Sequence, residues 1–209
     1  MNVAIFGGAG NMGKRYAKIV TQLGHKPVIY DINCEEPESI DLDCVIVTLP
    51  TDAHLSFLAV GKELEIPILC EKPISRYAGV IDCLESMESE GVNLQMVDQY
   101  AFCPRYKVEG GGDGTLYHSW HSGNDTLPWD CINIIAKAND LSKCSISNTA
   151  PRGHWECAIN GESLKLADME GAYKAMIEAW LKDPQPNYEY MKYAHKRVLE
   201  FIACKKATH

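Results

Sequence analysis

Residues 1–13 have the sequence Met1-Asn-Val-Ala-Ile-Phe-Gly-Gly-Ala-Gly-Asn-Met-Gly13. Residues 3–6 form a short continuous apolar run, which is typical of a central parallel strand buried on both faces. Residues 14–23 continue with apolar side chains at helical spacing, and Gly24 ends the pattern. The stretch therefore predicts a buried strand that leads through a glycine-rich turn into a helix.

The turn contains the pattern G-x-G-x-x-G at Gly8, Gly10 and Gly13. The first glycine allows the tight bend, the second lets the backbone approach a pyrophosphate, and the third lets the helix pack closely on the strand. Free N–H groups at the start of the helix then meet the phosphates. A glycine turn alone is a weak signal, but the flanking strand and helix favour a dinucleotide site that also includes Asn11 and Met12.

A second apolar strand is predicted over residues 26–30, directly before Asp31. This aspartate follows Gly13 by 18 positions. That is near the distance at which a carboxylate accepts from the ribose hydroxyls of NAD and repels the extra phosphate of NADP. A plain turn aspartate at a strand end is the alternative. Together with the glycine turn, Asp31 makes NAD the expected cofactor and NADP the less favoured one.

Strands and helices alternate through the first half of the chain. Residues 32–43 are short and acidic and contain Pro37, which leaves little room for the usual next helix and strand. The pattern continues with strands over residues 44–49, 66–70 and 93–97 and helices over residues 53–63 and 76–90. Because this alternation implies parallel pairing, we expect a trimmed, Rossmann-type parallel sheet in an α/β domain over residues 1–100.

The pattern changes after Gln99. Short strands are predicted over residues 115–120, 145–149, 155–160 and 163–166, the last two as a hairpin, and helices over residues 128–138, 168–181 and 188–204. We interpret the glycine run at 110–114 as a flexible turn, because no clear strand precedes it and no helix follows it. For residues 101–209 this pattern therefore predicts a small α+β domain built on a mixed or antiparallel sheet. Its last helices are expected to pack back on the first domain.

Composition narrows the class of protein. Of the 209 residues, 46% are hydrophobic and 23% are charged, as in an ordinary soluble globular protein. The net charge of -8 argues against nucleic-acid and anionic-membrane partners. The nine cysteines include no C-x-x-C pair, which suggests reduced thiols in a cytoplasmic compartment. We expect neither a signal peptide nor a membrane span.

Three stretches resemble the glucose-fructose oxidoreductase and inositol dehydrogenase (Gfo/Idh/MocA) family of NAD(P)-dependent oxidoreductases. They are the glycine turn, Val45-Ile-Val-Thr-Leu-Pro-Thr-Asp-Ala-His54, and Leu69-Cys-Glu-Lys-Pro73. The resemblance implies that Glu71 contacts ribose and that Lys72 stands beside the reacting carbon. It also implies that Pro50, Thr51 and His54 line the nicotinamide side, and Leu49 and Lys72 are expected among the cofactor-binding residues.

The middle of the chain departs from the family pattern, since only residues 107–167 remain for a sheet that is large in the family. Asp130 is the candidate counterpart of a catalytic aspartate, although a helix N-cap is the alternative. His118 would share a strand face with Trp120 and could line a substrate pocket as a further catalytic candidate. His118 and His121 point to opposite faces of a strand, so no metal site is expected.

The resemblance implies hydride transfer between nicotinamide and a small polar alcohol or carbonyl substrate, such as a sugar or cyclitol, with Lys72 exchanging the proton. We also expect a homo-oligomer that covers the second sheet. Two alternatives remain open: a non-catalytic NAD-binding sensor or interaction protein, and NAD-assisted elimination or hydrolysis of a glycoside.

Overall fold

The structure is a computed structural model that describes residues 1–32, 41–61, 63, 65–103, 115–119, 127–147, 155–159, 162–164 and 166–207. The chain divides into two compact units, the first formed by Met1–Val97 and Ile177–Met191, the second by Asp98–Met176 and Lys192–His209. The first unit thus includes residues 177–191, which the sequence assigned to the second domain. The predictions for residues 110–114, Trp120 and His121 lie outside the described residues.

The first unit is built on a five-stranded sheet of order β2-β1-β3-β4-β5, in which every neighbouring pair is parallel. This confirms the predicted Rossmann-type parallel sheet. Its elements are β1 (Asn2–Phe6), α1 (Asn11–Gln22), β2 (Lys26–Tyr30), β3 (Cys44–Val47), α2 (Thr51–Gly61), β4 (Ile68–Cys70), α3 (Val80–Ser89) and β5 (Leu94–Met96).

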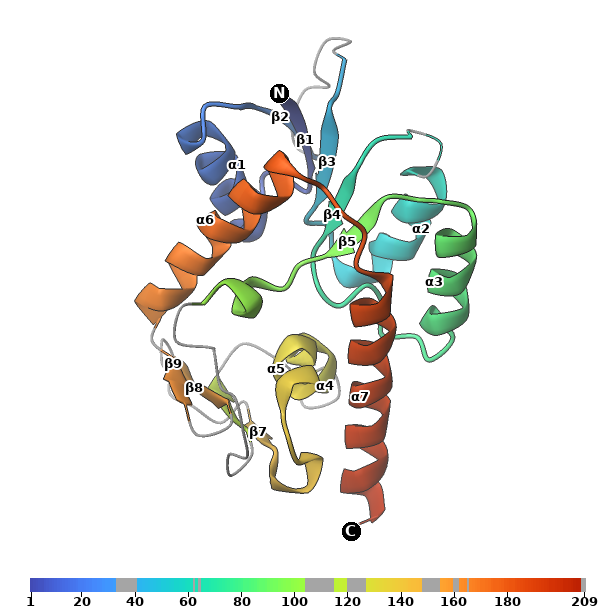
Figure 1. Cartoon of the computed structure of the whole chain (residues 1–209), viewed down its shortest axis with the longest axis vertical. Helices are drawn as coiled ribbons and strands as arrows, with labels where there is room; N and C mark the ends of the chain where they lie inside the picture. Colours follow the sequence, from blue (N-terminus) through green and yellow to red (C-terminus); the bar gives the residue numbers. More distant parts are fainter. Residues whose placement is uncertain are drawn as a thin grey trace. The chain divides into compact units, whose positions relative to one another are not determined.

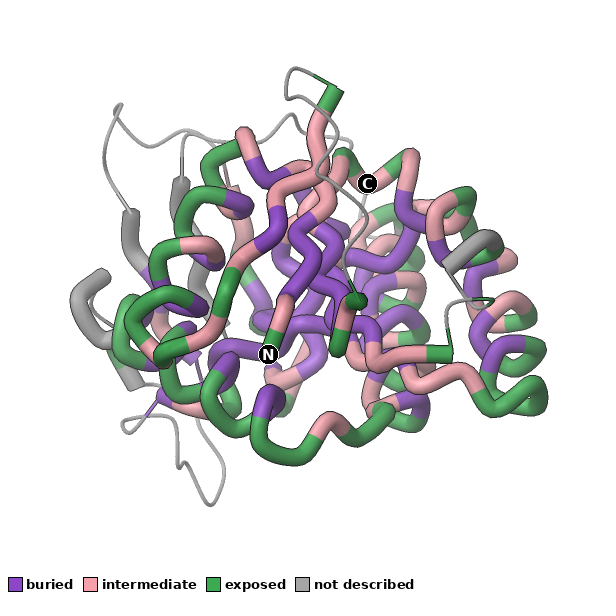
Figure 2. Tube along the Cα trace, turned by 90° about the horizontal axis from the view of Figure 1, so that it is seen from above, coloured by how far each residue is buried: buried purple, intermediate pink, exposed green. Residues whose placement is uncertain are grey.

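The centre of the sheet is buried on both faces. In Figure 1, α1 lies on one face, and α2 and α3 lie on the other. Ile5 of β1 pairs with Ile29 on one side and Ile46 on the other, and both Ile5 and Ile46 are fully buried. Figure 2 shows the strands mostly buried and the outer faces of the helices exposed. Burial on both faces explains why these strands are apolar without alternation.

The strand order fixes where a ligand can bind. After β1 the chain adds β2 on one side, and it then crosses to add β3 on the other side. Such a reversal opens a crevice at the carboxyl ends of the two strands, where ligands of α/β sheets bind. The glycine turn directly follows β1 and therefore lies at this switch point.

Helix α3 begins later than predicted. The sequence predicted a helix from residue 76, but α3 begins at Val80. The residues before it form a turn in which the Tyr77 N–H donates to Ser75 Oγ at 3.1 Å. Serine side chains often bond nearby backbone in this way and compete with helix formation.

Asn187 pairs with the outer edge of β5. Its side-chain amide donates to Met96 O at 3.0 Å and accepts from the Met96 N–H at 2.9 Å, so it takes the place of a further strand.

We expect Asn187→Ala to lower the free energy of unfolding by roughly 2–4 kcal/mol, because two backbone groups of Met96 lose their partners. Urea denaturation measures the change. Gln185→Ala, at an exposed side chain nearby, should stay within about 0.5 kcal/mol of the parent; equal stability of both variants would contradict the role of Asn187.

The second unit contains a four-stranded mixed sheet of order β7-β6-β8-β9. Strands β6 and β7 are parallel, whereas β8 pairs antiparallel with both β6 and β9, and β8 and β9 form the predicted hairpin. Its strands are β6 (Thr115–Ser119), β7 (Ser145–Ser147), β8 (Trp155–Ile159) and β9 (Glu162–Leu164). Helices α6 (Leu166–Lys182) and α7 (Tyr188–Ala207) contribute to both units.

The predicted helix over residues 128–138 is two short helices, α4 (Leu127–Asp130) and α5 (Ile132–Lys137). Lys137 forms a partly buried ion pair with Asp98, with Nζ 2.5 Å from Oδ2. Arg197 of α7 donates to Ala138 O at 2.7 Å, directly after α5. These bonds connect the C-terminal end of α5 to Asp98 and to α7.

Two further features bear on the sequence expectations. Every cysteine among the residues that the structure describes is a free thiol. Across the same part of the chain, no helix combines the length and the apolar character that a membrane span requires.

Candidate functional site

The glycine turn bends at Gly7, one residue before the position that the sequence predicted. Gly7 has φ +80°, and a Cβ there would meet the backbone of Thr48 at 2.8 Å. Only glycine adopts this conformation without strain in so close a contact. Gly13 has the predicted packing role, because a Cβ there would meet Gly7 O at 2.4 Å and Gly8 Cα at 2.5 Å. Helix α1 therefore approaches the turn as closely as backbone allows.

Main-chain bonds hold the turn to the strands on either side of β1. The N–H groups of Gly7 and Gly8 donate to Tyr30 O, at 2.9 and 3.3 Å. On the other side, the Thr48 hydroxyl lies 2.9 Å from Phe6 O and 3.0 Å from Gly7 O. The turn is thus fixed before any ligand arrives.

The start of α1 suits an anion. Gly10 is the N-cap and makes no side-chain cap bond, and no acidic residue occupies the first turn. The first main-chain bond of the helix is Lys14 N–H to Gly10 O at 2.9 Å. The N–H groups of Asn11, Met12 and Gly13 therefore have no acceptor within the helix, which is the arrangement that binds phosphate in nucleotide-binding turns.

Asp31 lies beside the same turn. Its Oδ2 accepts from the Ala9 N–H at 3.1 Å, so the carboxylate at the end of β2 reaches the middle of the glycine turn. An ionised carboxylate has about four acceptor sites, so the group can also accept from a ribose. Contacts of Asp31 with a ribose, and of the α1 N-terminus with a pyrophosphate, stay predictions.

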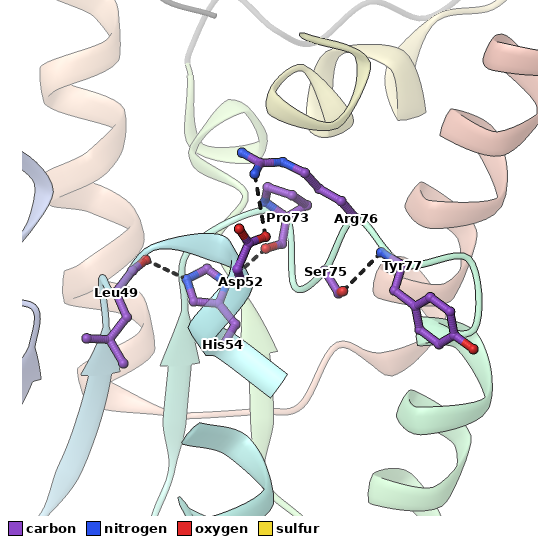
Figure 3. A network of polar contacts seen from close by, with 7 residues as sticks. All are labelled: Leu49, Asp52, His54, Pro73, Ser75, Arg76 and Tyr77. Carbon is purple, nitrogen blue, oxygen red and sulfur yellow. Dashed lines mark hydrogen bonds and ion pairs between the residues drawn. The ribbon is translucent and has the colours of Figure 1, made fainter. Parts of the chain in front are cut away.

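The segment after β3 combines an exposed Pro50, a half-buried Leu49 and Thr51, and a fully buried His54. The His54 Nε2 lies 2.8 Å from Leu49 O, and its Nδ1 lies 2.9 Å from Pro73 O (Figure 3). The imidazole thus faces two main-chain carbonyls. Contacts of Leu49, Pro50, Thr51 and His54 with nicotinamide stay predictions.

Glu71 and Lys72 follow β4 at the same edge of the sheet. The buried Glu71 accepts from the Tyr16 hydroxyl at 2.5 Å through Oε1 and from the Lys72 N–H at 3.1 Å through Oε2. Lys72 is half-buried and precedes Pro73 through a cis peptide bond. Burial, and then the neighbouring Glu71 charge, raises the pKa of the Cys70 thiol well above its ordinary value. The raised pKa favours the thiol over the more nucleophilic thiolate.

His118 and Asp130 belong to the second unit. His118 lies on β6, and Asp130 is the last residue of α4. The N-cap of α5 is Cys131, so the N-cap alternative for Asp130 is wrong. Asn133 of α5, three residues after Asp130, is buried. No group of three or more His, Cys, Asp or Glu side chains could hold a metal ion in the portion of the chain described.

Sequence reasoning missed three residues that shape this edge, namely Gly7, Tyr16 and Thr48. The doubled glycine directly after the strand was a local signal for Gly7. A tyrosine on the buried face of α1 signals a hydroxyl that needs a partner, but the partner, Glu71, lies 55 positions away. Thr48 gave no signal, because its role depends on the neighbouring strand.

The parallel sheet and its turn define a Rossmann-type unit, joined in one chain to an α+β unit. A myo-inositol dehydrogenase from Corynebacterium glutamicum has a similar structure, with a TM-score of 0.74 and 14% identity over 100% of this chain and 97% of that chain. The WlbA dehydrogenase from Thermus thermophilus aligns with a TM-score of 0.69 and 15% identity over 95% and 93% of the two chains. The chain thus has the fold of Gfo/Idh/MocA-type dehydrogenases, as the resemblance predicted.

Sequence similarity to curated proteins is weaker. The uncharacterized oxidoreductase YrbE of Bacillus subtilis is 26% identical over 136 residues, which cover 52% of this chain. The match covers 40% of YrbE, so the chain matches less than half the length of this relative. No family model matches the chain.

Proposed function

We propose that the protein is an NAD-dependent oxidoreductase that transfers a hydride between nicotinamide and a small polar alcohol or carbonyl substrate. The observation that carries the proposal is that the candidate residues all lie at the carboxyl ends of the parallel strands. There the glycine turn, the Asp31 carboxylate bonded to it, and the Glu71-Lys72 pair follow β1, β2 and β4 of one parallel sheet. Ligands of such sheets bind at this edge.

Two solved structures of this fold support the choice of cofactor and substrate class. The Thermus thermophilus WlbA dehydrogenase is in complex with NAD and UDP-GlcNAcA. The Corynebacterium glutamicum protein is a myo-inositol dehydrogenase. A polyhydroxylated substrate, either a sugar or a cyclitol, is therefore the class that we propose.

NAD supplies the two-electron acceptor for this chemistry. The Lys72 amine accepts the hydroxyl proton when an alcohol is oxidised, and its ammonium returns a proton to the carbonyl oxygen in the reverse direction. The Glu71 carboxylate accepts a hydrogen bond from the main-chain N–H of Lys72. Asp31 favours NAD over NADP, because the ribose of NAD has free hydroxyls. Asp130 and His118 stay candidate catalytic residues from the second unit.

The proposal is tested with the purified chain, NAD or NADP, and a panel of polyols, cyclitols and keto-sugars. We expect saturable NAD binding and a rise of nicotinamide absorbance with a member of the panel. Binding without turnover across the panel would favour the NAD-binding sensor. Product without net NADH would favour elimination or hydrolysis of a glycoside. Absence of NAD binding would overturn the proposal.

We also propose that the protein forms a homo-oligomer in the cytoplasm and that the second sheet forms the interface between the subunits.

Asp31→Ala should change the cofactor preference. We expect NAD affinity to fall by about tenfold to a hundredfold, because a charge-assisted bond is worth about 1.5–3 kcal/mol, while NADP affinity falls less. Titrations of both cofactors measure the ratio. Asp43→Ala is the matched control, since Asp43 also accepts a backbone N–H, from Asn2 at 2.6 Å, but at the opposite edge of the sheet. An equal loss for NAD and NADP would argue against the ribose contact.

A further inference from the structure

His54 connects the ends of two neighbouring strands. The ring is 1% exposed, and its two nitrogens lie 2.8 Å from Leu49 O and 2.9 Å from Pro73 O (Figure 3). Leu49 follows β3 and Pro73 follows β4, and these strands are adjacent. Carbonyl oxygens only accept, and a neutral imidazole carries one N–H, so the ring donates to Pro73 O when the proton is on Nδ1 and then lies against Leu49 O through an unprotonated Nε2. We call this arrangement the His54 bridge.

We infer that the His54 bridge positions Lys72 for proton exchange, an inference that rests on the proposed function. Pro73 directly follows Lys72, so the bond from His54 to Pro73 O fixes the main chain on the far side of the lysine. His54 is in this view a positioning residue, and its ring need not touch the nicotinamide.

The near side of Lys72 is fixed independently. The Glu71 N–H donates to Val47 O at 2.9 Å, and the Glu71 carboxylate binds both the Tyr16 hydroxyl and the Lys72 N–H. The segment Glu71-Lys72-Pro73 is thus held at its first residue by β3 and α1 and at its last residue by α2. Lys72 is the only member of the segment that is not buried.

This arrangement matters because a lysine amine sits at the end of a flexible four-carbon stem. Only the anchoring of its main chain limits where the amine can reach. A displacement of about 1 Å at a reacting group can cost about 10²-fold in rate. Removing the bridge should therefore slow the chemical step while the glycine turn, on β1, still binds cofactor.

An exposed contact between the same elements provides the comparison. Arg76 Nη1 lies 3.7 Å from Asp52 Oδ1 (Figure 3), and the Asp52 side chain is 88% exposed. Surface pairs of this kind contribute little. Asp52 lies two residues before His54 on α2, so Asp52→Asn perturbs the same helix turn without removing the bridge.

The test compares His54→Phe, which keeps a planar ring but has no N–H, with His54→Gln, which keeps an N–H donor. With NAD and the substrate found in the panel, we expect kcat of His54→Phe to fall roughly 10²-fold with a nearly unchanged dissociation constant for NAD. His54→Gln should recover part of the loss, and Asp52→Asn should match the parent. Hydrogen exchange in the cofactor-free protein should be about tenfold or more faster at the Lys72 amide of His54→Phe, which is next to the lost bond, and unchanged at Ile5 and at the Glu71 amide, which Val47 O holds independently.

The outcomes distinguish a failure of the proposed function from a failure of the positioning role of His54. A parent protein that transfers no hydride to any substrate overturns the proposed function, and the positioning role falls with it. An active parent whose kcat is unchanged in His54→Phe overturns the positioning role alone, even if exchange accelerates. If His54→Phe does not fold, His54→Ala, which also lacks the ring nitrogens, decides: a lower kcat with faster exchange supports the bridge, and parental values for both overturn it.

Discussion

We expect Lys72→Met to reduce turnover by roughly 10²–10⁴-fold, which is the range that a positioned general acid or base contributes. Methionine has a similar length and no titratable group, so the fold and the main-chain bond from the Lys72 N–H to Glu71 are retained. The glycine turn and Asp31 lie on other strands, and NAD binding should stay nearly intact. Steady-state kinetics and an NAD titration measure the two effects separately.

Lys14→Met is the matched control for this substitution. Lys14 is an exposed lysine on α1 in the same unit, and its amine plays no part in the proposed chemistry. We expect this variant to keep the parental kcat. Unchanged turnover in Lys72→Met would remove Lys72 from the mechanism, and a matching loss of NAD binding would assign it to cofactor binding instead.

Gly13→Ala destabilises the first unit by an amount at the upper end of about 1–3 kcal/mol, the usual cost of overpacking. The added Cβ would meet Gly7 O at 2.4 Å and the Gly8 backbone at 2.5 and 2.7 Å. These are main-chain atoms, so no flexible side chain can move aside, and α1 itself must shift. Because the shift moves the helix N-terminus, NAD affinity should fall as well. Urea denaturation and NAD titration measure both.

A glycine-to-alanine substitution on α6 should change the stability of the protein in the opposite direction. Gly171 lies on an exposed position of α6, and a Cβ there would meet no atom within 4 Å. Gly171→Ala should therefore stabilise the protein by about 0.5–1 kcal/mol, since glycine is unfavourable inside a helix. A similar change in stability for the two variants would contradict the close approach of α1 to the turn.

Local patterns predicted most of the first unit. The apolar runs at β1, β2 and β3 are long enough to signal buried strands, and residues at helical spacing signal α1 and α2. Boundaries differ by a few residues, and α3 begins at Val80 because a turn precedes it. In the second unit, the single predicted helix over residues 128–138 is two helices, α4 and α5. Propensity at the junction does not reveal such a break.

The sequence by itself determined the parallel sheet, the glycine turn at its switch point and the position of Asp31, because each depends on spacing within one or two adjacent elements. Tertiary structure alone decided that Tyr16 holds Glu71 and that the His54 ring faces two carbonyls. Asn187 completes β5 from 91 positions away. These contacts join residues far apart in the chain, and only the packing of separate strands and helices brings the partners within hydrogen-bond distance.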